Sequence, residues 1–305
     1  MILSLGLSPA LQRTLIFNEM QLNRVNRALQ VEQSAAGKAV NTARALSILN
    51  CECMVSGFNG GRNGALIERF LKEHNVISVM TPTAAETRIC TTLIDEAAQT
   101  ITELVEEAPQ PDANELLAFK TTNLQLIKES KMLVVSGTLP PYAAPDFYCA
   151  FTSVAESCGV PFVIDSHGDA LLRILVNKPL VAKLNLHELE KTFNFSAQDD
   201  DQVEHYLREL IQRGARNVFM TCGAEAAWLV TPERCVRMMP PPIRVHRNPI
   251  GSGDCTTAGL AARLLGGTHS LENAARFALA CGSANVESLV PADFSRARAE
   301  ELYRS

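Results

Sequence analysis

The sequence predicts an α/β fold with a mostly parallel central sheet, helices on both of its faces, and a small β-sheet beside it. Strand-like and helix-like segments alternate along most of the 305 residues, which is typical of a parallel sheet. The hydrophobic fraction of 47% is enough for a large core. Two segments without helical periodicity interrupt the alternation, and they predict the second sheet.

The elements of the main sheet follow one another in a regular order. Residues 2–7 form an apolar run that ends at Ser8-Pro9, as expected of a buried strand and not of a signal peptide. Residues 39–49 carry apolar side chains at helical spacing. By the same criteria we expect further strands at 54–57, 131–136, 161–165, 180–184 and 217–221, and further helices at 65–74, 113–129, 144–158 and 201–213.

The two interruptions predict a small sheet that acts as a lid. The first, at about 12–35, mixes polar and apolar residues; the second, at about 87–107, has the pattern of a hairpin with strands at 89–94 and 100–105. We expect both to belong to one domain that spans residues 1–305. Because the open edge and apolar face of such a sheet need cover, we also expect a homodimer that pairs through the lid.

Composition and charge argue against several classes of function. The net charge of −5 disfavours nucleic acid and anionic membranes as partners, whereas a few local Lys and Arg residues suffice to bind a phosphorylated ligand. The nine cysteines show neither a disulfide framework nor zinc-ligand spacing, so we expect reduced thiols and a cytoplasmic location. No apolar run is long enough to predict a membrane span. The first strand lacks a following G-x-G-x-x-G turn, which argues against a dinucleotide-binding dehydrogenase.

The most informative motif is Gly251-Ser252-Gly253-Asp254, which precedes a predicted helix that runs towards Leu265. Backbone N–H groups at a helix N-terminus form an anion site, and glycines let a phosphate approach the backbone closely. A carboxylate there could accept the proton of an attacking hydroxyl while the N–H groups stabilise a transferring phosphoryl group. The alternative is a simple turn and helix cap, with Asp254 favoured by the helix dipole.

Motifs along nearly the whole chain resemble those of the ribokinase-like (PfkB-type) carbohydrate kinases, in the same order. The Gly-Ser-Gly-Asp turn is similar to the family's G-A-G-D signature. Other segments resemble motifs of the 1-phosphofructokinase and tagatose-6-phosphate kinase branch: 7–11 (N-P-A-L), 25–27 (V-N-R), 36–44 (G-G-K-G-x-N-V-A-R), 86–88 (E-T-R), 136–141 (S-G-S-L-P-P), 165–171 (D-T-S-G-E-A-L), 178–188 (K-P-N-x-x-E) and 221–227 (S-x-G-x-x-G-A). The resemblance implies a ribokinase-like fold and the ATP-dependent phosphorylation of a hydroxyl of a small sugar phosphate.

On the nucleotide side, the resemblance implies a role for each matching residue. Asp254 is expected to be the general base, with the N–H groups of Gly251, Ser252 and Gly253 around the transferring phosphoryl group. Asn185 and Glu188 match the motif that positions Mg²⁺ through water, and their spacing also fits a helix capping box. Further ATP contacts are expected from Lys183, Thr221 and Gly223, and adenine contacts from Ala258 or Asn285.

On the substrate side, the resemblance implies a phosphate clamp and a sugar subsite. The clamp is expected from Arg27, Lys38 and Arg88, because Arg binds a phosphate bidentately and Lys binds it as a point charge. Gly37 and Asn41 match residues that contact the sugar. Gln12 stands where the family usually has an Asp that accepts hydrogen bonds from sugar hydroxyls, and its amide is neutral.

Other departures from the family pattern also bear on substrate binding. Ala36 and Ala39 replace two glycines, and because alanine resists positive φ we expect a reshaped loop. Pro249 replaces a Thr, and Leu184 replaces a Pro. Two alternatives stay open: a kinase of an unphosphorylated sugar, and a sugar-phosphate-binding protein with weak catalysis. The sequence does not choose among fructose 1-phosphate, fructose 6-phosphate and tagatose 6-phosphate.

Overall fold

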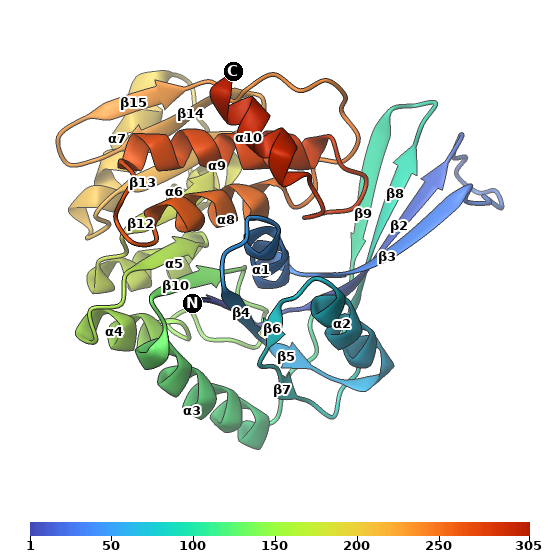
Figure 1. Cartoon of the computed structure of the whole chain (residues 1–305), viewed down its shortest axis with the longest axis horizontal. Coiled ribbons are helices and arrows are strands. Elements are labelled where there is room, and N and C mark those ends of the chain that lie inside the picture. The colour runs from blue at the N-terminus through green and yellow to red at the C-terminus, as the bar shows by residue number, and fades with distance from the viewer.

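A nine-stranded sheet forms the centre of the computed structural model, which describes residues 1–305 (Figure 1). The strand order is β15-β14-β13-β12-β11-β10-β1-β4-β6. Pairing is parallel from β6 to β13 and antiparallel between β13, β14 and β15. The strands are β1 (Ile2–Leu5), β4 (Cys53–Ser56), β6 (Ile77–Ser78), β10 (Met132–Ser136), β11 (Phe162–Asp165), β12 (Val181–Asn185), β13 (Val218–Cys222), β14 (Glu225–Val230) and β15 (Cys235–Met238).

Helices cover both faces of this sheet because successive residues of its strands face opposite sides. Ile2 belongs to one buried cluster together with residues of α1, α8 and α9, whereas Leu3 belongs to a second cluster with residues of α3, α4 and α7. The helices are α1 (Lys38–Ile48), α2 (Gly61–Glu73), α3 (Ala113–Glu129), α4 (Cys149–Ser157), α5 (Gly168–Ile174), α6 (Leu186–Phe193), α7 (Asp200–Gln212), α8 (Ser252–Leu264), α9 (Leu271–Val286) and α10 (Arg296–Arg304), with a short 3₁₀ turn at Leu175–Asn177.

A separate four-stranded sheet, here called the small sheet, projects from the side of the main sheet (Figure 1). Its order is β3-β2-β8-β9, built from β2 (Ala10–Phe17), β3 (Gln30–Ala36), β8 (Ile89–Asp95) and β9 (Thr100–Val105). Strands β8 and β9 form the predicted antiparallel hairpin, while β2 and β8 pair in parallel. A further short pair joins β5 (Phe58–Asn59) and β7 (Thr81–Pro82).

The predicted fold class is confirmed, and most predicted elements lie within a few residues of the observed ones. One clear difference is the helix predicted over 144–158, which begins only at Cys149 because the segment before it forms turns around Pro145. The loop that contains Ala36 and Ala39 places neither alanine at positive φ. The positive φ of that turn falls on Gly37 alone, at 105°, so neither alanine is strained. No helix has the length and apolar character needed to cross a bilayer.

Candidate active site

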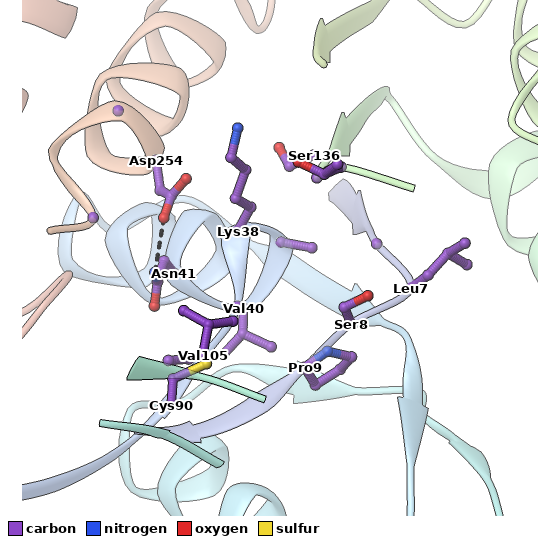
Figure 2. A pocket seen from close by; sticks show the side chains of 18 of the residues that line it. Leu7, Ser8, Pro9, Lys38, Val40, Asn41, Cys90, Val105, Ser136 and Asp254 are labelled. Carbon is purple, nitrogen blue, oxygen red and sulfur yellow. Dashed lines mark hydrogen bonds between the residues drawn. The ribbon is translucent and has the colours of Figure 1, made fainter. Parts of the chain in front are cut away.

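A cleft of about 590 Å³ opens between the main sheet and the small sheet. Its floor is formed where β1, β10 and β12 end at their carboxyl ends and where α1 and α8 begin. Ligands of open α/β sheets bind at this edge of the strands. Figure 2 shows Lys38 between Asp254 and Ser136, with Cys90 and Val105 of the small sheet on another wall.

The turn before α8 presents free backbone donors. Gly251 adopts a left-handed φ of 81°, which favours glycine. The N–H groups of Gly251, Gly253 and Asp254 donate to no acceptor in the protein, whereas the Ser252 N–H donates to the Pro249 carbonyl at 3.1 Å. The donors free to serve the predicted anion site are therefore those of residues 251, 253 and 254, and the Ser252 N–H closes the turn instead.

Asn285 holds this turn in place from behind. Its Nδ2 donates to the Ile250 carbonyl at 2.9 Å and to Ser252 Oγ at 3.0 Å, and its Oδ1 accepts from the Ala292 N–H at 2.7 Å. Its side chain is fully buried, as is that of Ala258 in the core. Neither residue lines the cleft, and their contacts with adenine stay a prediction.

Asp254 lies at the mouth of the turn and is only 6% exposed. Asn41 Nδ2 donates to Asp254 Oδ2 at 2.7 Å, which leaves Oδ1 without a partner (Figure 2). Burial and the nearby charge of Asp165 raise the pKa of Asp254 to about 7, against the opposing effects of Lys38 and the Asn41 bond. A carboxylate with one free oxygen and a pKa near neutrality is suited to general base catalysis.

Two lysines and two carboxylates form a network beside Asp254. Asp165 is fully buried. Its carboxylate accepts hydrogen bonds from Lys38 Nζ at 3.2 Å, Lys183 Nζ at 3.0 Å and the Thr257 hydroxyl at 2.7 Å. Lys38 also contacts Glu188 at 3.0 Å. Although burial acts to raise it, Lys183 and Lys38 hold the pKa of Asp165 below its ordinary value. This network places both ammonium groups next to the anion site.

Asn185 and Glu188 form the capping box of α6. Asn185 Oδ1 accepts from the Glu188 N–H, and Glu188 Oε2 accepts from the Asn185 N–H, each at 2.9 Å. Both residues also line the cleft, so the capping box is compatible with the predicted role in positioning Mg²⁺, which stays a prediction. Thr221 pairs in register with Asn185 on the neighbouring strand, and Gly223 lies just beyond it with a φ of 60°. Neither of these two lines the cleft itself.

The predicted phosphate clamp is not assembled within one chain. Arg27 is exposed on the loop between β2 and β3 and does not line the cleft, and Lys38 is engaged by two buried carboxylates. Arg88 does line it: Nη1 and Nη2 donate to the Glu106 and Ser8 carbonyls, while its buried Nε has no partner. Of the two members that line the cleft, Lys38 and Arg88, only Arg88 is not engaged by a carboxylate.

The part of the cleft predicted to bind the sugar, here called the sugar wall, carries unpaired polar atoms. Its residues are Gln12, Gly37, Asn41, Ser56 and Ser136. Gly37, Asn41 and Gln12 line the cleft, as predicted for the sugar subsite. Three buried oxygens have no hydrogen-bond partner, namely Asn41 Oδ1, Ser56 Oγ and Ser136 Oγ. Buried polar atoms are normally satisfied, so these indicate a polar ligand. Asp165, Thr257 and Ser56 were not predicted as site residues, and the only sequence signal for Asp165 was its place in the D-T-S-G-like motif.

Comparison with known proteins is consistent with this geometry. The family model for pfkB family carbohydrate kinases matches residues 8–295. A tagatose-6-phosphate kinase of Staphylococcus epidermidis is 31% identical over 268 residues, which cover 87% of this chain and 86% of that protein. Phosphofructokinase-2 from Escherichia coli, in its tetrameric inhibited form, superposes with a TM-score of 0.89 at 26% identity, covering 99% and 98% of the two chains.

A more distant comparison shows the fold alone. The ribokinase of Arabidopsis thaliana, complexed with ribose and ATP, superposes with a TM-score of 0.78 at 15% identity over 100% of this chain and 98% of that one. The main sheet and the small sheet are therefore the ribokinase-like arrangement. The family match over residues 8–295 and the relative that is 31% identical show that the chain belongs to the pfkB family of carbohydrate kinases.

Proposed function

We propose that this protein transfers the γ-phosphoryl group of ATP to a hydroxyl of a small sugar phosphate, with tagatose 6-phosphate as the first candidate. The observation that carries the proposal is the arrangement around Asp254. Its free Oδ1 faces a cleft beside three unused N–H donors. The similarity to a tagatose-6-phosphate kinase of Staphylococcus epidermidis supports the choice of sugar phosphate.

The residues of this chain divide the work of phosphoryl transfer. Asp254 Oδ1 takes the proton from the attacking hydroxyl, and its pKa of about 7 leaves a large fraction ionised at neutral pH. The free N–H groups of residues 251, 253 and 254 stabilise charge on the transferring group. Lys38 and Lys183 add positive charge at the same place. Closure of the small sheet over the cleft would exclude water and so limit hydrolysis of ATP.

Magnesium is the divalent ion that such a reaction uses, and the donor set fits it through water. Asn185 and Glu188 present only oxygen ligands, which Mg²⁺ prefers. No group of three His, Cys, Asp or Glu side chains is arranged to enclose a metal directly. We propose that these two residues hold hydrated Mg²⁺, which supplies charge neutralisation on the ATP phosphates when bound.

Arg88 is proposed to bind the phosphate that the sugar already carries. Arg88 lines the cleft, two backbone carbonyls fix its guanidinium in place, and no carboxylate neutralises it. A fixed guanidinium offers a directed donor to a phosphate oxygen. This favours a phosphorylated acceptor over a free sugar.

The small sheet is also proposed as the interface of a homodimer. This sheet and its β2–β3 loop expose several large apolar side chains: Leu22 (89%), Val25 (81%), Leu29 (67%), Val31 (48%), Leu104 (55%) and Val105 (53%). Exposed apolar groups gathered on one element mark interaction surfaces. Light scattering at micromolar concentration tests this, and a monomer would contradict it.

A substrate panel tests the proposed reaction. ADP release is measured with ATP and Mg²⁺ against tagatose 6-phosphate, fructose 6-phosphate, fructose 1-phosphate, fructose and ribose. We expect turnover of at least one phosphate ester, and Asp254→Asn should lower kcat by roughly 10²–10⁴-fold. The matched control is Asp201→Asn on α7, outside the cleft. Turnover of only the free sugars, or binding of sugar phosphates without turnover, would refute the proposal and favour one of the two alternatives.

A further inference from the structure

The sugar wall of the cleft lacks a carboxylate at position 12. Gln12 stands there, and its Nε2 donates to Thr92 Oγ1 at 2.7 Å. Its amide therefore points along the small sheet and carries no charge. A sugar hydroxyl is a better donor to a carboxylate than to an amide, because hydrogen bonds to ionised acceptors are stronger.

A carboxylate is present two strands away on the same wall. The register of the small sheet places Glu32, Thr14, Thr92 and Glu103 in one row across β3, β2, β8 and β9. Thr92, which Gln12 contacts, is thus the direct neighbour of Glu103. Alternate residues of a strand share a face, and Glu103 shares with Val105 the face that lines the cleft.

The Glu103 carboxylate has no protein partner to explain its position. The side chain lines the cleft and makes no hydrogen bond or ion pair with the protein. Glu103 is exposed to solvent, yet it lies on the face of β9 that lines the cleft, so its charge is within reach of a ligand there.

We propose that Glu103 is a specificity-determining residue that accepts hydrogen bonds from hydroxyls of the sugar phosphate, taking over the role of the carboxylate absent at position 12. A carboxylate has two oxygens and can accept from two neighbouring hydroxyls at once. The inference rests on the proposed function, because its ligand is the acceptor of that reaction.

The direction in which the affinity for the sugar phosphate changes when Glu103 is removed distinguishes this role from a general effect of its charge. A carboxylate that merely lines the cleft repels an anionic sugar phosphate, so its removal should tighten binding. A carboxylate that accepts hydrogen bonds from the sugar should loosen binding when it is removed. Glu103→Ala therefore gives opposite results under the two interpretations.

The test compares Kd for tagatose 6-phosphate by calorimetry with KM from ADP release. Glu103→Ala should raise both by roughly ten- to a hundredfold, the cost of losing hydrogen bonds to a charged group, while KM for ATP stays unchanged. Glu32→Ala is the matched control, because Glu32 lies in the same row at the other edge of the small sheet and contacts only Gln30. Adding Gln12→Asp to Glu103→Ala should recover most of the lost affinity.

The outcomes separate the two proposals. The role of Glu103 is overturned if the wild type is active and Glu103→Ala has the same Kd and KM as Glu32→Ala, or binds the sugar phosphate more tightly than the wild type. The kinase function then still stands. Failure of Gln12→Asp to restore affinity shows that the two positions do not serve the same hydroxyls, and it overturns the replacement. Binding without turnover refutes the kinase function, yet Kd still tests Glu103. A wild-type protein that neither binds nor turns over any of the three sugar phosphates overturns both.

Discussion

The bond between Asn41 and Asp254 makes a prediction that can be worked out in magnitude and sign. Asn41 donates to the ionised carboxylate at 2.7 Å inside a buried site, so the bond stabilises the charged form and lowers the pKa. Asn41→Leu keeps the size of the side chain, excludes water and removes the donor. A hydrogen bond to a charged group contributes roughly 1.5–3 kcal/mol, which corresponds to roughly one to two pH units. The pKa of Asp254 should therefore rise from about 7 by that amount.

The assay is the pH profile of kcat/KM, measured by ADP release from about pH 5.5 to about pH 9.5, because this parameter reports the free enzyme. Wild type should lose activity below a midpoint near 7. In Asn41→Leu the midpoint moves up by roughly one to two units, so the rate at neutral pH falls by roughly five- to fiftyfold and recovers in alkali. Loss of a sugar contact by Asn41 would scale the whole profile without moving its midpoint.

Two controls make this result decisive. Thr42→Val removes a neighbouring hydroxyl that bonds only the Lys38 carbonyl, and it should leave the midpoint in place. Asp254→Asn should abolish the acid limb altogether. A midpoint that stays where it is in Asn41→Leu, or that moves down, would refute the reasoning, since the bond would then not control the charge of Asp254.

Three further predictions concern other parts of the molecule. Asp165→Asn removes the negative charge that helps to raise the pKa of Asp254, so the acid limb should move to lower pH; calorimetry should also show a lower Tm, because two lysines lose a buried partner. An upward move of the limb would contradict this. Arg88→Met should raise KM for the sugar phosphate by about tenfold or more while KM for ATP is unchanged, and an equal rise in both would argue against a phosphate contact. Leu104→Glu should convert the proposed dimer to a monomer in light scattering, while Leu117→Glu, at a leucine of α3 that is at least as exposed, should not.

The main fold was predictable because its sequence periods are local and strong. The strand at 132–136 reads Met-Leu-Val-Val-Ser and is buried throughout, and α3 begins at a full capping box between Asp112 and Glu115. The parallel pairing of β2 with β8 was harder to predict, because no short turn links the two strands and their register depends on how each leaves the main sheet. The sequence of either segment alone does not indicate that these two strands pair.

The candidate site was predicted in outline and not in its pairings. The motifs identified Asp254, Asn41, Lys183 and Glu188, and all four line one cleft. They did not reveal that Lys38 binds Asp165 and Glu188, because a sequence motif does not record which anion a lysine neutralises after folding. The role of Asn285 was missed for a similar reason, since its four contacts come from the turn, from the first residues of α8 and from the segment after α9.

The charges of the site explain why the pKa of Asp254 is raised. The network holds two ammonium groups, on Lys38 and Lys183, against the carboxylates of Asp165, Glu188 and Asp254. The lysines form ion pairs with Asp165 and Glu188, whereas Asp254 accepts a hydrogen bond only from the neutral amide of Asn41. Its charge is thus the uncompensated one, and a buried carboxylate in that position shifts towards its protonated form. Pairing Asp254 with a lysine would have fixed it as a weak base, whereas this arrangement leaves it able to take a proton from an alcohol and to release it again near neutral pH.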